Sequence, residues 1–327
     1  MLQSRRLAIM LSILITLMFA VFIHAQPSGK VPRIGYLTAG DPGPNAPRLK
    51  ALRQGLHELG YVEGETIAVE VRYGERKFDR IPALAAELVR LNVDVIVTGG
   101  GIDTRAAKGA THAIPIVMAQ DPDPIASGFV ASLARPGGNI TGLSSMAPEI
   151  AGKRLEILKT LLPQLSRVAA FGVSRNPINA SALREVERAA KASGVTLQFV
   201  DVDMKNFEQA FHAASDGRAE AILILPGPFV SIRKHILALA MQYRLPMIYD
   251  RPSFAKAGGL IAYGTDLVEL HRRAATYVDQ ILQGAKPGDL PVQQPTKFDM
   301  VINLKTAKAL GVTIPPTLLF QATEVIQ

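Results

Sequence analysis

The chain has 327 residues, no cysteine and a formal net charge of +8. Without cysteine, a disulfide scaffold, a thiolate metal site and a lipid-modified cysteine after a leader are all excluded. Lys and Arg are scattered among acids rather than gathered in basic runs with aromatic residues, so we expect no nucleic-acid partner.

Residues 1–25 are typical of a secretory signal peptide. Arg5 and Arg6 precede an apolar run from Leu7 to Ile23, and Ala25 stands at the expected cleavage position. The run is shorter than the ~20 residues that a membrane-spanning helix needs, although an uncleaved anchor is the alternative. We therefore expect cleavage after Ala25 and a periplasmic location.

Short β-branched runs alternate with amphipathic helical patterns from Val31 onward. The patterns predict strands at 31–37, 66–72, 93–97 and 114–118, and helices at 47–59, 81–91 and after the glycines 99–101. Strands that alternate with helices predict a parallel sheet with helices on both faces.

The same alternation restarts after about residue 145. It predicts strands at 167–173, 195–200, 221–225 and 246–249, with helices at 178–192, 207–214 and 232–243. A strand at 260–264, a helix at 267–282, a strand at 296–302 and a helix at 304–310 follow. The repeated order predicts two similarly built α/β lobes.

The candidate site lies in the loops that follow the strands. In parallel α/β sheets, ligands bind beyond the carboxyl ends of the strands. Helices begin after most of these loops, so free N–H groups suit a carboxylate there, and an Asp suits an ammonium group. The candidate ligand-binding residues are Thr38, Thr98, Gly99, Gly100, Gly101, Asp121, Ser174, Asn176, Gly227, Tyr249 and Asp250.

Several of these residues have a purely structural alternative. Asp121 either faces the cleft or caps a helix that starts near Ile125, and Asp250 is similar. The glycines 99–101 either let the backbone approach a ligand or form a plain turn. Tyr249 either stacks on a flat ligand or belongs to the core.

We find no catalytic or metal-binding pattern in the sequence. The glycines 99–101 lack the Lys-Ser/Thr of a triphosphate loop, and Thr104 stands where a dinucleotide fingerprint needs its third glycine. His57-Glu58 begins like a zinc-protease helix, but Tyr61 occupies the position of the second histidine. A nucleophile elbow of the G-x-S-x-G type is absent as well. We expect no enzyme activity, no cofactor and no metal.

Four segments are distinctive when taken together. They are RQGLHELGYVEG at 53–64, VDVIVTGG at 93–100, the stretch from Asp121-Pro122 to ARPGGNITG at 134–142, and INLKTAKALG at 302–311 with IPP at 314–316. Through them the chain resembles the ABC transporter substrate-binding proteins of the tryptophan/tyrosine-binding type, a branch of the type I periplasmic binding protein fold.

The resemblance implies two Rossmann-like parallel-sheet lobes joined by a three-stranded hinge. Residues 31–143 plus 264–288 would form the first lobe, and 144–263 plus 289–327 the second. Family members bind their ligand with first-lobe loops, which by position are Thr38, the loop 98–101 and Asp121. Relatives often have Thr-Pro after two glycines, whereas this chain has Gly101-Ile102 and lacks that hydroxyl.

The resemblance also implies a function. The chain would be the solute-binding component of an ABC importer, a monomer that captures an amino acid or a related small carboxylate between its lobes. Permease and ATPase subunits would receive the ligand. The alternatives are a ligand-sensing module for a membrane receptor and a secreted α/β enzyme. A repressor-type regulator of this fold would need a helix-turn-helix where the apolar leader stands.

Overall fold

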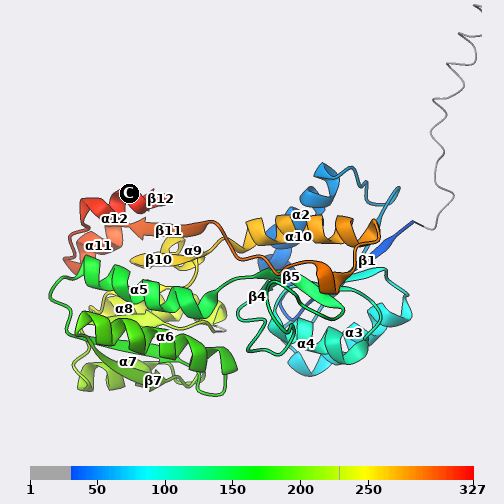
Figure 1. Ribbon diagram of the computed structural model, residues 1–327. Helices are drawn as coiled ribbons and strands as arrows, with labels where there is room; N and C mark the ends of the chain where they lie inside the picture. The colour runs from blue at the N-terminus through cyan, green and yellow to red at the C-terminus, as the bar shows by residue number, and fades with distance from the viewer. Residues whose placement is uncertain (1–30, 228) are drawn as a thin grey trace, which may run out of the picture.

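The computed structural model describes residues 31–227 and 229–327, so the predicted signal peptide lies outside the described residues. Two α/β lobes lie side by side (Figure 1). Each is built around its own sheet, one of five strands and one of seven. None of the helices within these described ranges is long and apolar enough to cross a membrane.

The first sheet is entirely parallel and has the order β2-β1-β3-β4-β5. Its strands are β1 (Arg33–Thr38), β2 (Ala68–Tyr73), β3 (Val95–Thr98), β4 (Ile116–Asp121) and β5 (Ile140–Ser144). Every residue of β3 and β5 is buried, which is typical of a parallel sheet covered on both faces.

Helices cover both faces of this sheet. One face carries α2 (Pro42–Glu58) and α10 (Leu267–Leu282), whose apolar residues share a core cluster with β1 and β3. The other face carries η1 (Phe78–Arg80), α3 (Ile81–Arg90) and α4 (Gly101–Ala110). A Cβ on Gly55 would lie 2.3 Å from the carbonyl oxygen of Arg272, so glycine lets α2 and α10 approach closely.

The second sheet has the order β12-β11-β10-β9-β8-β6-β7. Its strands are β6 (Arg167–Gly172), β7 (Thr196–Asp201), β8 (Ala221–Ile224), β9 (Met247–Tyr249), β10 (Ile261–Thr265), β11 (Phe298–Asn303) and β12 (Glu324–Ile326). Only β10 and β11 pair antiparallel among the strand pairs of the described residues. The chain re-enters this lobe from the first one, so β11 starts at the end where β10 finishes.

Two separate clusters of apolar residues form the core of the second lobe. On one face, α5 (Ala147–Leu161), α6 (Pro177–Ser193), α11 (Leu304–Leu310) and α12 (Pro316–Gln321) supply Leu, Ile, Val and Ala. On the other, α7 (Glu208–Asp216), η2 (Phe229–Ile232), α8 (Arg233–Gln242) and α9 (Pro252–Lys256) enclose a group of phenylalanines.

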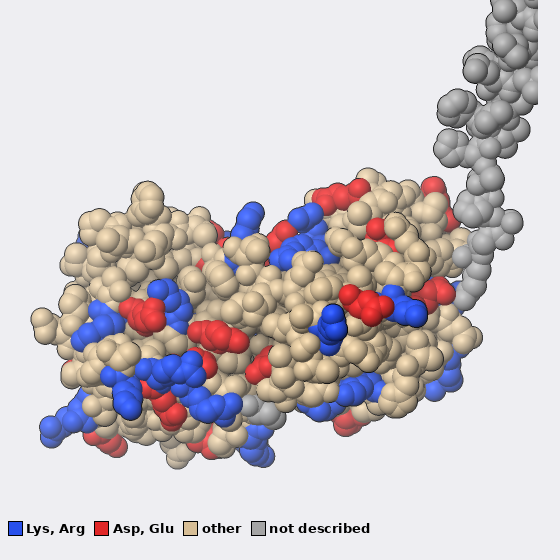
Figure 2. Space-filling view, in the orientation of Figure 1, with Lys and Arg blue, Asp and Glu red and all other residues tan. Residues whose placement is uncertain are grey.

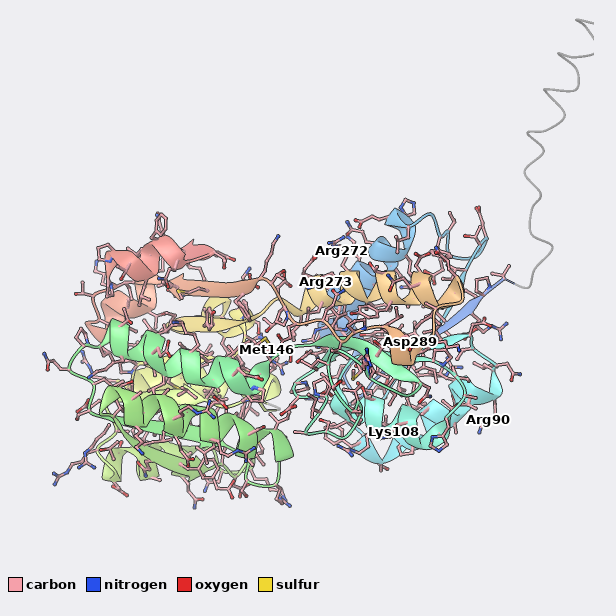
Figure 3. All side chains as sticks on the ribbon, in the orientation of Figure 1. Arg90, Lys108, Met146, Arg272, Arg273 and Asp289 are labelled. Atoms are coloured by element: carbon pink, nitrogen blue, oxygen red, sulfur yellow. The ribbon has the colours of Figure 1, made fainter. Side chains whose placement is uncertain are left out.

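Three chain segments cross between the lobes. They join β5 to α5, β10 to α10, and η3 (Pro287–Asp289) to β11. Hydrogen bonds tie them together: Thr265 Oγ1 donates to the carbonyl of Ser145 at 2.7 Å, and Ser144 N donates to the carbonyl of Gln293 at 2.9 Å. Met146, labelled between the lobes in Figure 3, has the left-handed φ of 51° where the first segment turns into α5.

This architecture confirms the predicted fold of two Rossmann-like lobes with a three-stranded hinge. The exact lobe bounds at 143/144, 263/264 and 288/289 stay a prediction. Several details differ from the sequence expectations. The structure adds β5, α5, α9, α12 and β12, it begins α2 at Pro42 rather than Pro47, and it forms turns instead of a helix near Ile125.

Charges are mixed over the molecular surface. Figure 2 shows Lys and Arg interspersed with Asp and Glu across the viewed face of both lobes. This face carries no extended field of one sign, which matches the scattered charges in the sequence.

Candidate functional site

The carboxyl ends of β1, β3 and β4 bring the predicted first-lobe residues together. Thr38 and Thr98 end two adjacent strands and are both buried. A Cβ on Gly99 would lie 3.0 Å from Thr38 Oγ1 and 3.3 Å from the Tyr36 hydroxyl, so these groups are neighbours. Gln120 Nε2 donates to the carbonyl of Gly99 at 2.8 Å and holds the glycine loop in place.

The glycine loop ends at the N-terminus of α4. Gly100 is the N-cap and Gly101 is the first helical residue, and no side chain caps the helix. Thr104 Oγ1 lies 2.7 Å from Thr98 Oγ1 and donates to the carbonyl of Gly100 at 3.0 Å. The first-turn N–H groups have no intrahelical acceptor and carry partial positive charge, which suits a carboxylate.

Asp121 lies beside this helix end and is fully buried. Its Oδ1 accepts from Asp123 N at 2.9 Å and from Ser127 Oγ at 3.4 Å. Its Oδ2 has no hydrogen-bond partner in the described protein, and a Cβ on Gly101 would lie 2.9 Å from it. One oxygen therefore caps a turn, not the helix predicted near Ile125, and the other faces the start of α4. Burial raises the pKa of Asp121 to about 7.

Three more buried polar atoms near this edge of the sheet have no hydrogen-bond partner among the described residues. They are the Tyr36 hydroxyl, Asp103 Oδ1 and His271 Nε2. The rings of Tyr36 and His271 meet edge to face at 6.1 Å. Burial raises the pKa of Asp103 to about 8 and lowers that of His271 to about 3. Since buried polar groups are normally hydrogen-bonded, this edge has unused capacity for a ligand or for water.

The predicted polar residues of the second lobe hold their own loops. Ser174 Oγ donates to Asp201 Oδ2 at 2.6 Å, and the backbone N of Ser174 donates to Oδ1 of the same carboxylate. Asn176 caps α6 by accepting from Ile178 N, and its Nδ2 donates to the carbonyl of Pro226 at 3.1 Å. Their side-chain groups are engaged within the lobe.

Gly227 and Tyr249 lie against the second-lobe core. A Cβ on Gly227 would lie 2.4 Å from the ring of Phe229, so a side chain there would displace that ring. Tyr249 is buried and stacks on Phe254 at 4.8 Å with an interplanar angle of 12°. The ring of Tyr249 thus belongs to the core, which was the structural alternative to stacking on a ligand.

Asp250 lies where the two lobes approach each other. Its carboxylate pairs with Arg251 Nε at 3.3 Å. Arg154 lies in the same area, and its Nε donates to the carbonyl of Tyr263 on β10 at 2.8 Å. Burial and then the positive charge of Arg251 lower the pKa of Arg48, a first-lobe residue on α2, to about 10. Charges from both lobes therefore act on one another at the strand ends.

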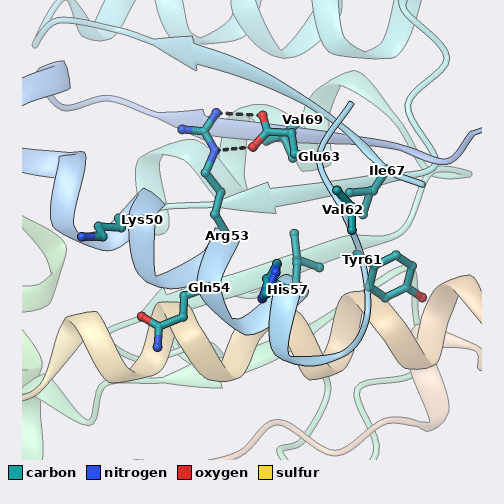
Figure 4. Close-up of a pocket in the computed structure, with 10 residues that line it drawn as sticks. Lys50, Arg53, Gln54, His57, Tyr61, Val62, Glu63, Ile67 and Val69 are labelled. Atoms are coloured by element: carbon teal, nitrogen blue, oxygen red, sulfur yellow. Dashed lines mark hydrogen bonds and ion pairs between the residues drawn. The ribbon is translucent and has the colours of Figure 1, made fainter. Parts of the chain in front are cut away.

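A separate surface pocket of about 470 Å³ lies between α2 and the segment 61–69. Arg53 and Glu63 form an ion pair of 2.8 Å at its edge (Figure 4). The pocket contains none of the residues predicted to bind ligand, and it lies away from the carboxyl ends of the strands. We do not assign it to the ligand site.

The described residues contain no group of side chains suited to a metal centre. No three His, Cys, Asp or Glu side chains of residues 31–227 and 229–327 are grouped so that they could hold an ion.

Comparison with known proteins identifies the family. The model of the family described as ABC transporter substrate binding protein matches residues 46–326. The chain belongs to this family. Substrate-binding proteins of such transporters capture a small molecule, as the sequence resemblance implied.

Relatives of this substrate-binding protein support the same conclusion. It is 26% identical over 265 residues to a tyrosine-binding protein of Clostridioides difficile, covering 80% of this chain and 75% of the relative. A solved structure from Streptococcus pneumonia, described as an ABC domain in complex with L-Trp, has a TM-score of 0.83 at 25% identity. It covers 91% of this chain and all of that one. A conserved domain protein of Vibrio cholerae has a TM-score of 0.83 at 26% identity, covering 90% and 100%.

Sequence reasoning missed two arginines whose charges interact with Asp250 and Arg251. Arg48 was included in a predicted helix without a role, and Arg154 lies in a helix that was not predicted. An arginine among Ile150, Ala151, Leu155 and Leu158, at the spacing of one buried helix face, was the available signal for Arg154.

Proposed function

We propose that this substrate-binding protein binds an α-amino acid, or a related small carboxylate, at the first-lobe strand ends. The proposed site consists of Thr38, Thr98, the glycines 99–101 and Asp121. In this arrangement the ligand's ammonium group pairs with Asp121 Oδ2, and the second lobe closes over the bound molecule. Closure then follows because the ligand interacts with both lobes only in the closed state.

The unpartnered oxygen of Asp121 carries this proposal. It is buried, it lies beside the open N-terminus of α4, and no group of the described protein satisfies it. A ligand ammonium supplies a donor and a positive charge at that oxygen, which makes the ionised carboxylate favourable despite its burial. The relatives named as binding tyrosine or holding L-Trp are amino-acid binders, which supports the same class of ligand.

The remaining parts of the proposal follow from the family. We infer that residues 1–25 export the chain to the periplasm and that the protein acts there as a monomer without catalysis. Permease and ATPase subunits of an ABC importer would receive the ligand.

A thermal-shift panel tests the proposal. The twenty L-amino acids and a set of small carboxylic acids are added separately to the purified mature chain. A ligand at 100 times its dissociation constant should raise the free energy of unfolding by ~2.7 kcal/mol, which corresponds to several degrees in the melting temperature. Native mass spectrometry of the untreated protein then detects any co-purified molecule. A panel without any shift, together with an empty native spectrum, would contradict amino-acid binding.

Amino-acid affinity should depend on pH through Asp121. The folded pKa of about 7 lies above the ordinary value of 3.8, so below pH 7 the unliganded carboxyl is largely protonated. An ammonium group needs the ionised form, and affinity should therefore fall roughly tenfold per pH unit below about pH 6. Besides burial, the charge of Asp123 raises this pKa and the charge of Arg105 lowers it. Isothermal titration calorimetry from pH 5 to pH 8 measures the effect.

The control for this titration is the Asp121→Asn variant. Its side chain does not titrate, so its weaker binding should be nearly independent of pH over the same range. A wild-type affinity that stays constant between pH 5 and pH 8 would show that the carboxyl does not meet a charged group of the ligand.

A further inference from the structure

Arg154 is a buried arginine with unused hydrogen-bonding capacity. It lies on α5 directly behind the hinge and is 2% exposed. Its Nε donates to the carbonyl of Tyr263, but its Nη1 has no partner in the described protein. A guanidinium carries donors in a fixed fork that matches a carboxylate, so a buried unpartnered Nη1 is a strong indication of a missing acceptor.

Arg251 adds a second positive charge at the same place. Its Nε pairs with Asp250, whose side chain is only 9% exposed. Asp250 also acts on Arg154, where its negative charge favours the guanidinium while Arg251 disfavours it. Within the second lobe, the carboxylate of Asp250 thus interacts electrostatically with both Arg154 and Arg251.

Arg48 brings a third positive charge from the opposite lobe. It lies on α2, half-buried, next to Tyr36 and Asp103, and its hydrogen bond to Asn45 Oδ1 is long at 3.4 Å. Arg251 is the largest electrostatic contribution that disfavours its charge. Arg48 and Arg251 therefore belong to different lobes but lie close enough for their charges to repel each other.

The acids nearby do not balance these three arginines. Asp250 is shared between the lobes, and burial raises the pKa of Asp103 to about 8, so at neutral pH Asp103 is largely uncharged. Solvent weakens the repulsion at the partly exposed Arg48 and Arg251, whereas the charge of the buried Arg154 is poorly screened. An anion placed between the arginines removes that repulsion and supplies the acceptor that Arg154 lacks.

We propose that Arg48, Arg154 and Arg251 form an oxyanion subsite between the lobes, which takes the ligand's carboxylate and makes closure depend on it. The ligand's identity as an amino acid rests on the proposed function above. The subsite also orients the ligand, since the ammonium binds at Asp121 on the first lobe and the carboxylate bridges the two lobes. An amine without a carboxylate would occupy the first lobe but leave the cleft open.

Ligand binding tests the subsite. We measure the affinities of L-tryptophan, L-tyrosine, tryptamine and tyramine for the wild type, Arg48→Gln and Arg251→Gln. Each variant should bind the amino acids about 10- to 100-fold more weakly, while its affinity for the two amines stays within threefold of the wild type. The matched control is Arg53→Gln, an exposed arginine on the same helix as Arg48, which should bind all four compounds like the wild type.

A second measurement needs no amino acid. Spectroscopic labels on the two lobes report the interlobe distance of the unliganded protein at 20 mM and at 500 mM NaCl. Screening reduces repulsion between the arginines, so the wild type should close partly at high salt. Arg48→Gln should be closed to the same extent at both concentrations. These distances also show whether each variant is folded.

The outcomes separate this inference from the proposed function. Unchanged amino-acid affinity in both arginine variants overturns the subsite and leaves amino-acid binding intact. An equal loss for amines and amino acids also overturns it, because the arginines would then act only on the fold. A third outcome is that no amino acid binds but the change of interlobe distance with salt depends on Arg48. The proposed function then fails, whereas repulsion between Arg48 and Arg251 is supported. A salt-independent wild-type distance overturns the dependence of closure on an anion.

Discussion

The Asp121→Asn protein is expected to fold like the wild type and to bind its amino acid at least about thirtyfold more weakly. Removing one partner of a buried charge pair costs ~2–5 kcal/mol, and ~1.4 kcal/mol corresponds to a factor of ten in affinity. The amide can still accept the hydrogen bond from Asp123 N, so the turn after β4 should persist. Calorimetric titration with the best ligand of the thermal-shift panel measures the loss.

Stability separates a binding effect from a folding effect in this variant. The substitution removes a buried carboxyl whose ionisation is unfavourable, so the melting temperature at pH 8 should stay the same or rise. Asp216→Asn, at an exposed position on α7, is the control and should change neither property. Wild-type affinity in Asp121→Asn would remove Asp121 from the site.

The Gly142→Ala protein is expected to lose about 3 kcal/mol or more of its free energy of unfolding. Gly142 lies in β5 with a φ of 128°, a conformation that L-residues with a side chain rarely adopt. A Cβ there would lie 2.2 Å from the carbonyl oxygen of Met118 and 2.6 Å from its nitrogen. Both contacts are with backbone of the paired strand, so they cannot be relieved by a rotamer change. Thermal denaturation should show a drop of the order of 10 °C.

Gly109→Ala provides the opposite control. Gly109 is an exposed residue of α4, and a Cβ there would meet nothing within 4 Å. Alanine should therefore stabilise the helix by up to ~1 kcal/mol. A melting temperature of Gly142→Ala within 2 °C of the wild type would show that β4 and β5 can separate without cost.

Much of the fold could be predicted because the spacing of apolar residues along the sequence indicates which face of a helix or strand is buried. The helices α10 and α11 have the predicted bounds, and the strands that were predicted differ from the observed ones by a few residues at most. Strand β5 was missed because its sequence, ITGLS, includes glycine and serine and depends on pairing with β4. Helix α5 was missed because Arg154 interrupts an otherwise apolar face.

The first-lobe part of the site could be predicted to a greater extent than the second. Thr38, Gly99 and Asp121 are adjacent because parallel strands end at one edge, which is a consequence of topology alone. Ser174 and Asn176 obey the same rule, but their hydrogen bonds are made within the lobe. Whether a loop residue is free or already paired depends on side-chain geometry that strand order does not contain.

Arg48 and Arg251 could not have been linked from the sequence. They lie about two hundred positions apart, on a helix of one lobe and after a strand of the other. Their interaction depends on how closely the three crossing segments hold the lobes, which no local pattern specifies. The signal that exists is compositional: an arginine next to a strand-end aspartate, as in Asp250-Arg251.

Helix α10 also dictates the order in which the chain can mature. Its residues Leu270, Ala274 and Tyr277 complete the core that contains Leu52 of α2, yet they are synthesised after β6 to β10. The apolar face of the first sheet that α2 and α10 cover therefore cannot be fully buried until residue 282 has left the ribosome. Such contacts between distant parts of the sequence form slowly. The first lobe thus completes its core late in synthesis, after strands β6 to β10 of the second lobe have already been made.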